Sequence, residues 1–305
     1  MNRSKKDQIR IGIDLGGTKI EMIALDHFGD VLKQQRIQTP VGEYEKTIKS
    51  IARLVLDFEK DFNIKASVGV GMPGAISPVT GKVKNSNSIC LNSKPFKQDL
   101  ESVLNRLIRI ENDANCFALS EAKDGAAAGE NIVFGVILGT GVGGGLVING
   151  ELISGPNAIS GEWGHNPLPW PDEKEFMDAA GCYCGKKGCI ETWLNGEGLS
   201  RTFYDLTAQD CSPSEIAIRA DMADKQALKV LNQYAIRLAK SLSSVINILD
   251  PEVIVLGGGL SNINRIYSLV PELWHEYIFS DRVDTRLVPA KFGDASGVRG
   301  AAWLW

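Results

Sequence analysis

One pattern occurs twice in this chain: an apolar strand, a glycine-rich turn and a second apolar strand, at residues 9–25 and again at residues 132–152. The first copy reads "IRIGID", "LGGTK" and "IEMIALD", and the second reads "IVFGVILGTGVGGGLVING". Each copy is typical of a β-hairpin, because glycine adopts the backbone conformations that tight turns need. The recurrence indicates a weak internal duplication, and it predicts two α/β domains with a cleft between them.

The segments between the hairpins alternate between helical and strand patterns. Residues 43–62 have apolar side chains at helical spacing, namely Ile48, Ile51, Leu54, Val55 and Phe58. We expect further helices at "DLESVLNRL", at "ANCFALSEAKDGAAAG" and over residues 226–249, and further strands at "SVGVGMPG", "IRIEND" and "EVIVLGGG". The domain boundary is expected near residues 113–118.

Charge and hydropathy exclude several classes of protein. The net charge of −4 gives no basic surplus for binding nucleic acid. Residues 1–10 are basic and polar and lead straight into a strand pattern, so we expect no secretory signal there. The longest apolar window, residues 132–148, is interrupted by glycines and a threonine, which is unsuitable for a membrane helix. We therefore expect a cytoplasmic protein with reduced thiols.

Three glycine-rich turns are candidates for binding phosphate: residues 16–18, 139–145 and 257–259. Glycine lets backbone N–H groups approach an anion closely, although each turn is equally consistent with a simple tight connection. Asp14 stands at the end of the strand before the first turn. A carboxylate in that position suits an outer-shell Mg²⁺ ligand, since Mg²⁺ keeps several waters and uses few carboxylates.

The second turn also contains a glycine pattern found in dinucleotide-binding enzymes. Gly139, Gly141 and Gly144 satisfy G-x-G-x-x-G after a strand. However, the residues that follow, "LVING", are typical of a strand rather than of the required helix. A dehydrogenase is therefore disfavoured.

A cluster of cysteines lies in "CYCGKKGCIETW", at Cys182, Cys184 and Cys189, with His165 the nearest histidine upstream. Three thiolates and one imidazole make a complete tetrahedral zinc site. Buried thiols and a redox pair remain alternatives, and a disulfide is disfavoured in a reducing compartment. With four protein ligands no position is left for water, so a zinc ion here would be structural.

Three carboxylates are candidate functional groups. Asp113, in "ENDAN", is either the N-cap of the following helix or a carboxylate at the end of a strand that points into the cleft. Glu162 and Glu191 would each be typical of a solvated surface, but both lie next to the cysteine cluster. Glu162 precedes His165 by three residues, so one helical turn would place both on a single face.

Together, the stretches "IGIDLGGTKI", "GVGMPG", "ENDANCFALSEA", "LGTGVGGG", "GEWGH", "CYCGKKGCIE" and "VIVLGGGLSN" resemble the ROK family of bacterial sugar kinases and repressors, over essentially the whole chain. The resemblance implies the actin-like ATPase fold, with duplicated ribonuclease H-like α/β domains. The smaller domain would comprise residues 1–116, with the segment at about 290–305 packing back on it. The larger domain, residues 117–289, would hold the zinc site and the second phosphate loop.

The resemblance implies ATP-dependent phosphorylation of a hexose. "NSNS" and "HNPLPW" favour the fructokinase branch, of mannokinase type, which converts D-fructose to D-fructose 6-phosphate. N-acetylglucosamine, glucose and mannose kinases are alternatives. A sugar-responsive regulator is disfavoured, because the first strand begins near residue 9 and leaves no room for a DNA-binding segment before it. The implied cofactors are ATP with Mg²⁺ and structural Zn²⁺, and the implied partners are the hexose and a second subunit in a homodimer, with no nucleic acid or membrane.

The resemblance also implies roles for individual residues, with Asp113 as the general base. The implied sugar ligands are Gly74, Asn87, Asn112, Asp113, Glu162, His165 and Glu191. The implied nucleotide-binding residues are Gly12, Ile13, Asp14, Leu15, Gly16, Gly17, Thr18 and Lys19 in the first phosphate loop, Gly139, Thr140, Gly141, Val142, Gly143 and Gly144 in the second, and Gly257 and Gly258 beside the adenosine. The implied zinc ligands are His165, Cys182, Cys184 and Cys189. We further expect the zinc site to hold Glu162 and Glu191 toward the sugar.

Overall fold

The computed structural model describes residues 9–305. The expectation that no secretory signal is present concerns residues 1–10, of which residues 1–8 lie outside the described part. The chain divides into two compact units, of which unit 1 contains the residues up to Gly129, Gly145–Ser160 and Asp294–Trp305. Unit 2 contains Glu130–Gly144 and Gly161–Gly293. This division differs from the expected domains, because the expected boundary after residue 116 falls inside a helix of unit 1.

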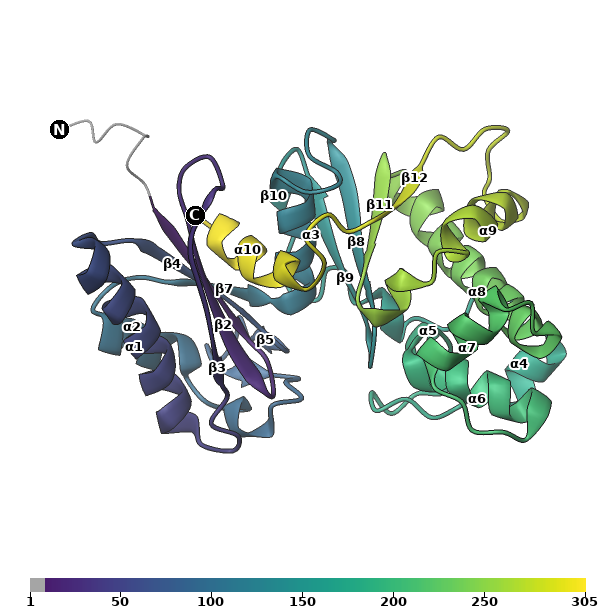
Figure 1. The fold of residues 1–305 in the computed structure, drawn as a ribbon, viewed down its shortest axis with the longest axis horizontal. Helices are drawn as coiled ribbons and strands as arrows, with labels where there is room; N and C mark the ends of the chain where they lie inside the picture. The colour runs from purple at the N-terminus through teal and green to yellow at the C-terminus, as the bar shows by residue number, and fades with distance from the viewer. Residues whose placement is uncertain (1–8) are drawn as a thin grey trace. The chain divides into compact units, whose positions relative to one another are not determined.

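Unit 1 contains a five-stranded sheet with the order β3-β2-β1-β4-β7 (Figure 1). The β2 strand is antiparallel to β1 and β3, whereas β4 is parallel to β1 and β7. A separate pair of short strands, β5 and β6, lies outside this sheet. The strands are β1 (Arg10–Leu15), β2 (Lys19–Leu25), β3 (Val31–Gln38), β4 (Ser67–Met72), β5 (Ala75–Ile76), β6 (Val83–Lys84) and β7 (Arg109–Asn112).

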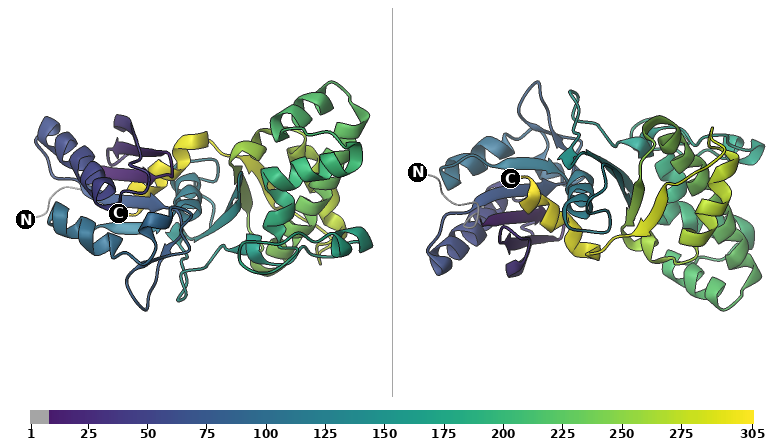
Figure 2. Two further views of the ribbon diagram at one scale, coloured as in Figure 1. Left: turned by 90° about the horizontal axis from the view of Figure 1, so that it is seen from below. Right: turned by 90° about the horizontal axis from the view of Figure 1, so that it is seen from above.

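Four α-helices of unit 1 are α1 (Tyr44–Phe62), α2 (Phe96–Leu104), α3 (Asp113–Lys123) and α10 (Ser296–Trp303). All five apolar residues predicted for one face of α1 are buried. Helices α1 and α2 cover one face of the first sheet and α10 covers the other, as Figures 1 and 2 show. The expected helix over residues 114–129 ends earlier, at Lys123, where Ser120 O accepts the N–H groups of the next two residues.

A second five-stranded sheet has the order β10-β9-β8-β11-β12, and the division between the units falls within β9. Its strands are β8 (Ile132–Leu138), β9 (Val142–Ile148), β10 (Glu151–Leu152), β11 (Val253–Gly257) and β12 (Arg286–Pro289). β11 is parallel to β8 and to β12, and β10 is antiparallel to β9. If the strands of each sheet are numbered in chain order, both sheets have the order 3-2-1-4-5. This agrees with the duplication that the repeated hairpin predicts.

The helices of unit 2 are α4 (Glu173–Met177), α5 (Ile190–Leu194), α6 (Gly196–Thr207), α7 (Pro213–Asp221), α8 (Lys225–Leu249) and α9 (Ile266–Leu273), and they gather on one side of β8, β11 and β12 (Figure 1). The predicted helix over residues 226–249 is confirmed as α8. It begins because the Asp224 side chain accepts the N–H groups of Gln226 and Ala227. It ends at Asp250 in the left-handed region, directly before Pro251. Among residues 9–305, no helix is long and apolar enough to cross a membrane.

Candidate functional site

The first glycine turn connects β1 to β2 in unit 1. The N–H of Gly16 donates to the carbonyl oxygen of Lys19 at 3.0 Å, which closes a tight turn. Gly17 and Thr18 are exposed, and a Cβ added to Gly17 would meet no atom within 4 Å. The backbone of this turn is therefore open to a ligand, as a phosphate loop requires.

Four residues predicted for the first phosphate loop lie instead within β1, and three of them, Gly12, Ile13 and Leu15, serve the packing of the unit. Ile13 and Leu15 have at most 1% of their surface exposed and belong to the core of unit 1. Gly12 faces α10, where an added Cβ would lie 2.1 Å from the carbonyl oxygen of Val298. These three residues build the sheet and its helix contact, whereas the turn itself runs from Gly16 to Lys19.

Asp14 is the next-to-last residue of β1 and lies near other acidic groups. Burial, and after it the negative charges of Asp113 and Glu21, together raise the pKa of its carboxyl to about 7. Neighbouring carboxylates of this kind are what a divalent cation neutralises, and carboxylate oxygens are ligands that Mg²⁺ prefers. Asp14 therefore offers a ligand of the kind that Mg²⁺ prefers.

Asp113 is the first residue of α3, and its side chain is exposed. The N-cap is its neighbour Asn112, whose Oδ1 accepts the N–H of Ala114 at 2.8 Å. Asp113 Oδ1 accepts the same N–H at 2.9 Å. The N-cap role that the sequence left open for Asp113 thus belongs to Asn112. The helix dipole favours a negative charge at this position, so Asp113 is placed where a carboxylate is stabilised.

Two predicted sugar ligands contact each other: Asn112 Nδ2 donates to the carbonyl oxygen of Gly74 at 3.2 Å. Gly74 has φ of 81°, and a Cβ there would lie 2.5 Å from the carbonyl oxygen of Lys84, so only glycine fits. A further predicted sugar ligand of unit 1, Asn87, is exposed. It lines a cavity of about 260 Å³ together with Gly17.

The second glycine turn lies in unit 2, between β8 and β9. The N–H of Gly139 donates to the carbonyl oxygen of Gly141 at 3.0 Å, and β9 begins at Val142. Gly143 and Gly144 lie inside β9, so the turn is shorter than the predicted loop over residues 139–144. A strand follows the turn, as expected, which agrees with setting the dinucleotide-binding pattern aside.

The third glycine turn follows β11, which ends at Gly257. Gly258 has φ of 82°, and a Cβ there would lie 2.4 Å from the carbonyl oxygen of Leu138. The close approach of two backbones therefore requires glycine at residue 258, whether or not a ligand binds.

The predicted metal ligands come together in unit 2. One ligand atom from each of His165, Cys182, Cys184 and Cys189 lies within 4.8 Å of the others. His165 Nδ1 lies 3.6 Å from Cys182 Sγ, and Cys184 Sγ lies 3.6 Å from Cys189 Sγ. These separations suit four ligands around one tetrahedral ion with metal–sulfur bonds of about 2.3 Å. The cluster therefore fits Zn²⁺.

The electrostatics of the cluster also suit a cation. Burial, together with the neighbouring thiols of Cys184 and Cys182, raises the pKa of Cys189 to about 12. The backbone N–H of Lys186 lowers the pKa of Cys184. Thiols packed this closely do not all ionise unless a positive charge offsets their repulsion. A bound metal ion supplies that charge.

The second ring nitrogen of His165 has two polar neighbours. His165 Nε2 lies 2.9 Å from Tyr183 Oη and 3.8 Å from Glu162 Oε2. Glu162 directly precedes the 3₁₀ helix Trp163–His165, so the expected turn brings both side chains together. Tyr183 was not among the predicted site residues, and its position between Cys182 and Cys184 is the sequence feature that points to it.

Glu191, on α5, links the cysteine cluster to the second glycine turn. Its Oε2 accepts the N–H of Val142 at 3.0 Å, and its Oε1 lies 3.9 Å from Cys182 Sγ. The Glu191 side chain is buried. The sequence predicted a carboxylate near the cysteines, but not its hydrogen bond to the glycine turn.

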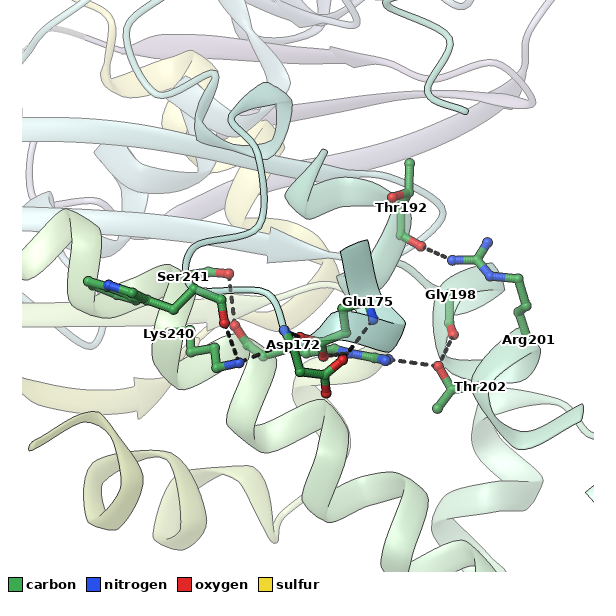
Figure 3. A network of polar contacts seen from close by, with 10 residues as sticks. Asp172, Glu175, Thr192, Gly198, Arg201, Thr202, Lys240 and Ser241 are labelled. Atoms are coloured by element: carbon green, nitrogen blue, oxygen red, sulfur yellow. Dashed lines mark hydrogen bonds and ion pairs between the residues drawn. The ribbon is translucent and has the colours of Figure 1, made fainter. Parts of the chain in front are cut away.

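A buried polar network lies among α4, α6 and α8 (Figure 3). Glu175 accepts hydrogen bonds from Arg237 Nε at 2.8 Å and from Lys240 Nζ at 3.5 Å. Arg237 also donates to Thr202 Oγ1 at 2.8 Å. All these charges are paired, as burial requires, so the network fixes the helices next to α5.

Comparison with known proteins places the chain in a family. The model described as "ROK family" matches residues 10–305. The N-acetyl-D-glucosamine kinase of Pasteurella multocida (strain Pm70) is 39% identical over 307 residues, which cover 97% of this chain and 99% of that protein.

Two solved structures share the fold. The ROK hexokinase from Thermus thermophilus has a TM-score of 0.85 and 29% identity, over 97% of both chains. A ROK family glucokinase from Streptomyces griseus, in complex with glucose and AMPPNP, has a TM-score of 0.78 and 25% identity, over 97% of this chain and 98% of that one. The fold is the actin-like ATPase fold that the sequence predicted, and the chain belongs to the ROK family.

Proposed function

We propose that this protein is an ATP-dependent kinase of N-acetyl-D-glucosamine. The observation that carries the proposal is the Pasteurella multocida relative, an N-acetyl-D-glucosamine kinase that matches nearly the full length of the chain. The expected preference for fructose rested on two short stretches, "NSNS" and "HNPLPW", and these relatives do not support it. The substrate that the sequence analysis gave as an alternative is therefore the better supported one.

In this proposal Asp113 is the general base. Its carboxylate accepts the proton of a sugar hydroxyl as that oxygen bonds to the γ-phosphorus of ATP, while the bond to the ADP oxygen breaks. The exposure of Asp113 at the start of α3 supports this role, because the carboxylate is within reach of a ligand. The turns at residues 16–18 and 139–141 would bind the phosphates through backbone N–H groups. Asp14 would hold Mg²⁺, which offsets the negative charge of the phosphates when bound.

The proposed sugar ligands are Gly74, Asn87 and Asn112 in unit 1 and Glu162, His165 and Glu191 in unit 2. Carboxylate and amide groups suit this task, since one such side chain accepts hydrogen bonds from two vicinal hydroxyls. Glu191 has one oxygen on the Val142 N–H, so Oε1 is the atom proposed for the sugar. His165, Cys182, Cys184 and Cys189 would hold a structural Zn²⁺ with no open position.

A panel of sugars tests the proposal. Release of ADP from ATP with Mg²⁺ is followed for N-acetylglucosamine, mannose, glucose and fructose, and kcat/KM is compared. We expect the value for N-acetylglucosamine to exceed the others by about tenfold or more, which corresponds to about 1.4 kcal/mol of transition-state binding. A higher value for fructose would overturn the choice of substrate. If calorimetry showed that a sugar binds, and no sugar in the panel led to release of ADP from ATP, a regulator would be supported instead.

A further inference from the structure

The segment that joins α5 to α6 holds the second glycine turn from one side. Asn195 Nδ2 donates to the carbonyl oxygen of Thr140 at 3.2 Å, and the N–H of Gly196 donates to the carbonyl oxygen of Gly139 at 2.9 Å. Both carbonyl oxygens belong to the turn itself. Two carbonyl oxygens of the turn therefore accept hydrogen bonds from residues more than 50 positions later in the sequence.

Glu191 holds the same turn by accepting a hydrogen bond from the N–H that ends it. Its Oε2 accepts the N–H of Val142 at 3.0 Å, and a Cβ added to Gly141 would lie 2.8 Å from that oxygen. The carboxylate thus packs directly against the glycine backbone. A hydrogen bond from an amide to a buried carboxylate is among the stronger kinds.

The helix that presents Glu191 is itself fixed at both ends. Its N-cap is Cys189, a member of the metal cluster, and Thr192 Oγ1 donates to the carbonyl oxygen of Cys189 at 2.8 Å. Arg201 donates to the carbonyl oxygen of Thr192 (Figure 3). Buried Tyr234 donates its hydroxyl to the carbonyl oxygen of Leu194 at 2.9 Å. The helix is a rigid support between the metal cluster and the glycine turn.

We propose that the segment Cys189–Gly196, here called the α5 strut, sets the backbone of the second glycine turn for binding ATP phosphates. Glu191 and Asn195 are its positioning residues, and Cys189 couples it to the metal cluster. The proposal rests on the proposed function, because that function assigns nucleotide binding to this turn. A glycine-rich turn loses much conformational entropy when a ligand orders it, and a turn that is already held loses less on binding.

The first test uses Asn195→Asp. The aspartate keeps the oxygen that accepts the N–H of Gly198 and caps α6, but it lacks the donor to Thr140. We expect the Kd for AMPPNP with Mg²⁺, measured by calorimetry, to rise about five- to tenfold, as the loss of one hydrogen bond predicts. The Kd for the sugar should stay within about twofold. Asn195→Ser is the control for the added charge, because serine is neutral and caps helices but lacks the amide donor, so its Kd should rise as well.

The second test uses Glu191→Gln and Glu191→Ala. Glutamine keeps an oxygen that accepts the N–H of Val142, whereas alanine does not. Hydrogen exchange of the Val142 amide should therefore be slow in the native protein and in Glu191→Gln, and at least tenfold faster in Glu191→Ala. Removal of the metal with a chelator should also speed this exchange, because Cys189 begins the strut.

The outcomes separate the two proposals. If the native protein does not bind AMPPNP with Mg²⁺, the proposed function is wrong. If the native protein binds it and Asn195→Asp binds it equally well, the strut does not position the turn. Equal Val142 exchange in the native protein and in a folded Glu191→Ala would overturn the proposal independently of any activity.

Discussion

Gly12 of β1 lies directly against the backbone of Val298 in α10: a Cβ at residue 12 would be 2.1 Å from the Val298 carbonyl oxygen. It would also be 2.7 Å from the N–H nitrogen of Ala302. No side chain fits without moving the helix, which packs on the sheet through Val298 and Ala302. This glycine therefore serves the contact between a strand and the C-terminal helix, although it belongs to the motif that predicted a phosphate loop.

Gly12→Ala should therefore destabilise the protein, by about 1–3 kcal/mol or more, since overpacking a filled contact costs that amount. Gly17→Ala is the matched control, because its Cβ would meet no atom within 4 Å. Denaturant unfolding should show little change for Gly17→Ala, while its KM for ATP should rise if the turn binds phosphate. A greater loss of stability in Gly17→Ala than in Gly12→Ala would contradict this assignment of roles.

Features encoded by short-range patterns were predictable. The hairpins, the buried face of α1 and the cysteine cluster follow from spacings of a few residues, which reflect the periods of strands and helices and the geometry of a metal site. Even so, one motif mixed two functions, because the stretch from Gly12 to Lys19 includes both core strand and exposed turn.

Long-range contacts were not predictable from one sequence. Glu191 and Val142 are 49 residues apart, and Asn195 and Thr140 are 55 apart, with no local pattern that pairs them. The choice of sugar could not be predicted either, because short stretches such as "NSNS" do not fix the geometry of a binding loop. The return of α10 to the first sheet is also a contact between the two ends of the chain, and it was expected only because of the family resemblance, not from any local pattern.

Asp14 predicts a pH dependence of stability in the absence of Mg²⁺ and nucleotide. Burial, with Asp113 and Glu21, raises its pKa from 3.8 to about 7, so between these values the folded protein holds a proton that the unfolded chain releases. The contribution of this group to the free energy of unfolding is therefore fully present below pH 4 and is lost as pH rises through 7.

Asp14→Asn should remove this loss of stability at high pH. At pH 8 its free energy of unfolding should exceed that of the native protein by about 2–4 kcal/mol, at about 1.4 kcal/mol per pKa unit. Denaturant unfolding at pH 5 and pH 8 measures the difference, and Asp281→Asn, at an exposed aspartate, is the control. An equal response of both variants to pH would show that Asp14 titrates normally in the folded state.

Cys184→Ser tests the metal cluster. Cys184 is exposed, so the change leaves the core intact while it replaces a thiolate ligand with a poor one. We expect the zinc content, measured by elemental analysis, to fall well below one ion per chain and the Tm to drop by about 5 °C or more. The KM for the sugar should rise, because Glu162 and Glu191 flank the cluster.

Cys211→Ser is the control for this experiment, since Cys211 lies in the same unit but outside the cluster. It should keep its zinc whatever happens to its stability. If Cys184→Ser retained a full zinc ion, the proposed ligand set would be wrong. If it lost zinc with no change in sugar affinity, the metal would not hold the sugar ligands.

Asp113→Asn tests the general base directly. The amide keeps the size of the side chain and an oxygen for the N–H of Ala114, so α3 should still begin at this residue. It does not accept a proton from a hydroxyl, and kcat should therefore fall by about 10²–10⁴-fold or more, with little change in the KM for ATP. The activity that remains in the purified Asp113→Asn variant also sets an upper limit on the activity of contaminating kinases. Thermal unfolding of the variant should match that of Asp281→Asn, and a folded Asp113→Asn protein with a near-native kcat would assign the base to another group.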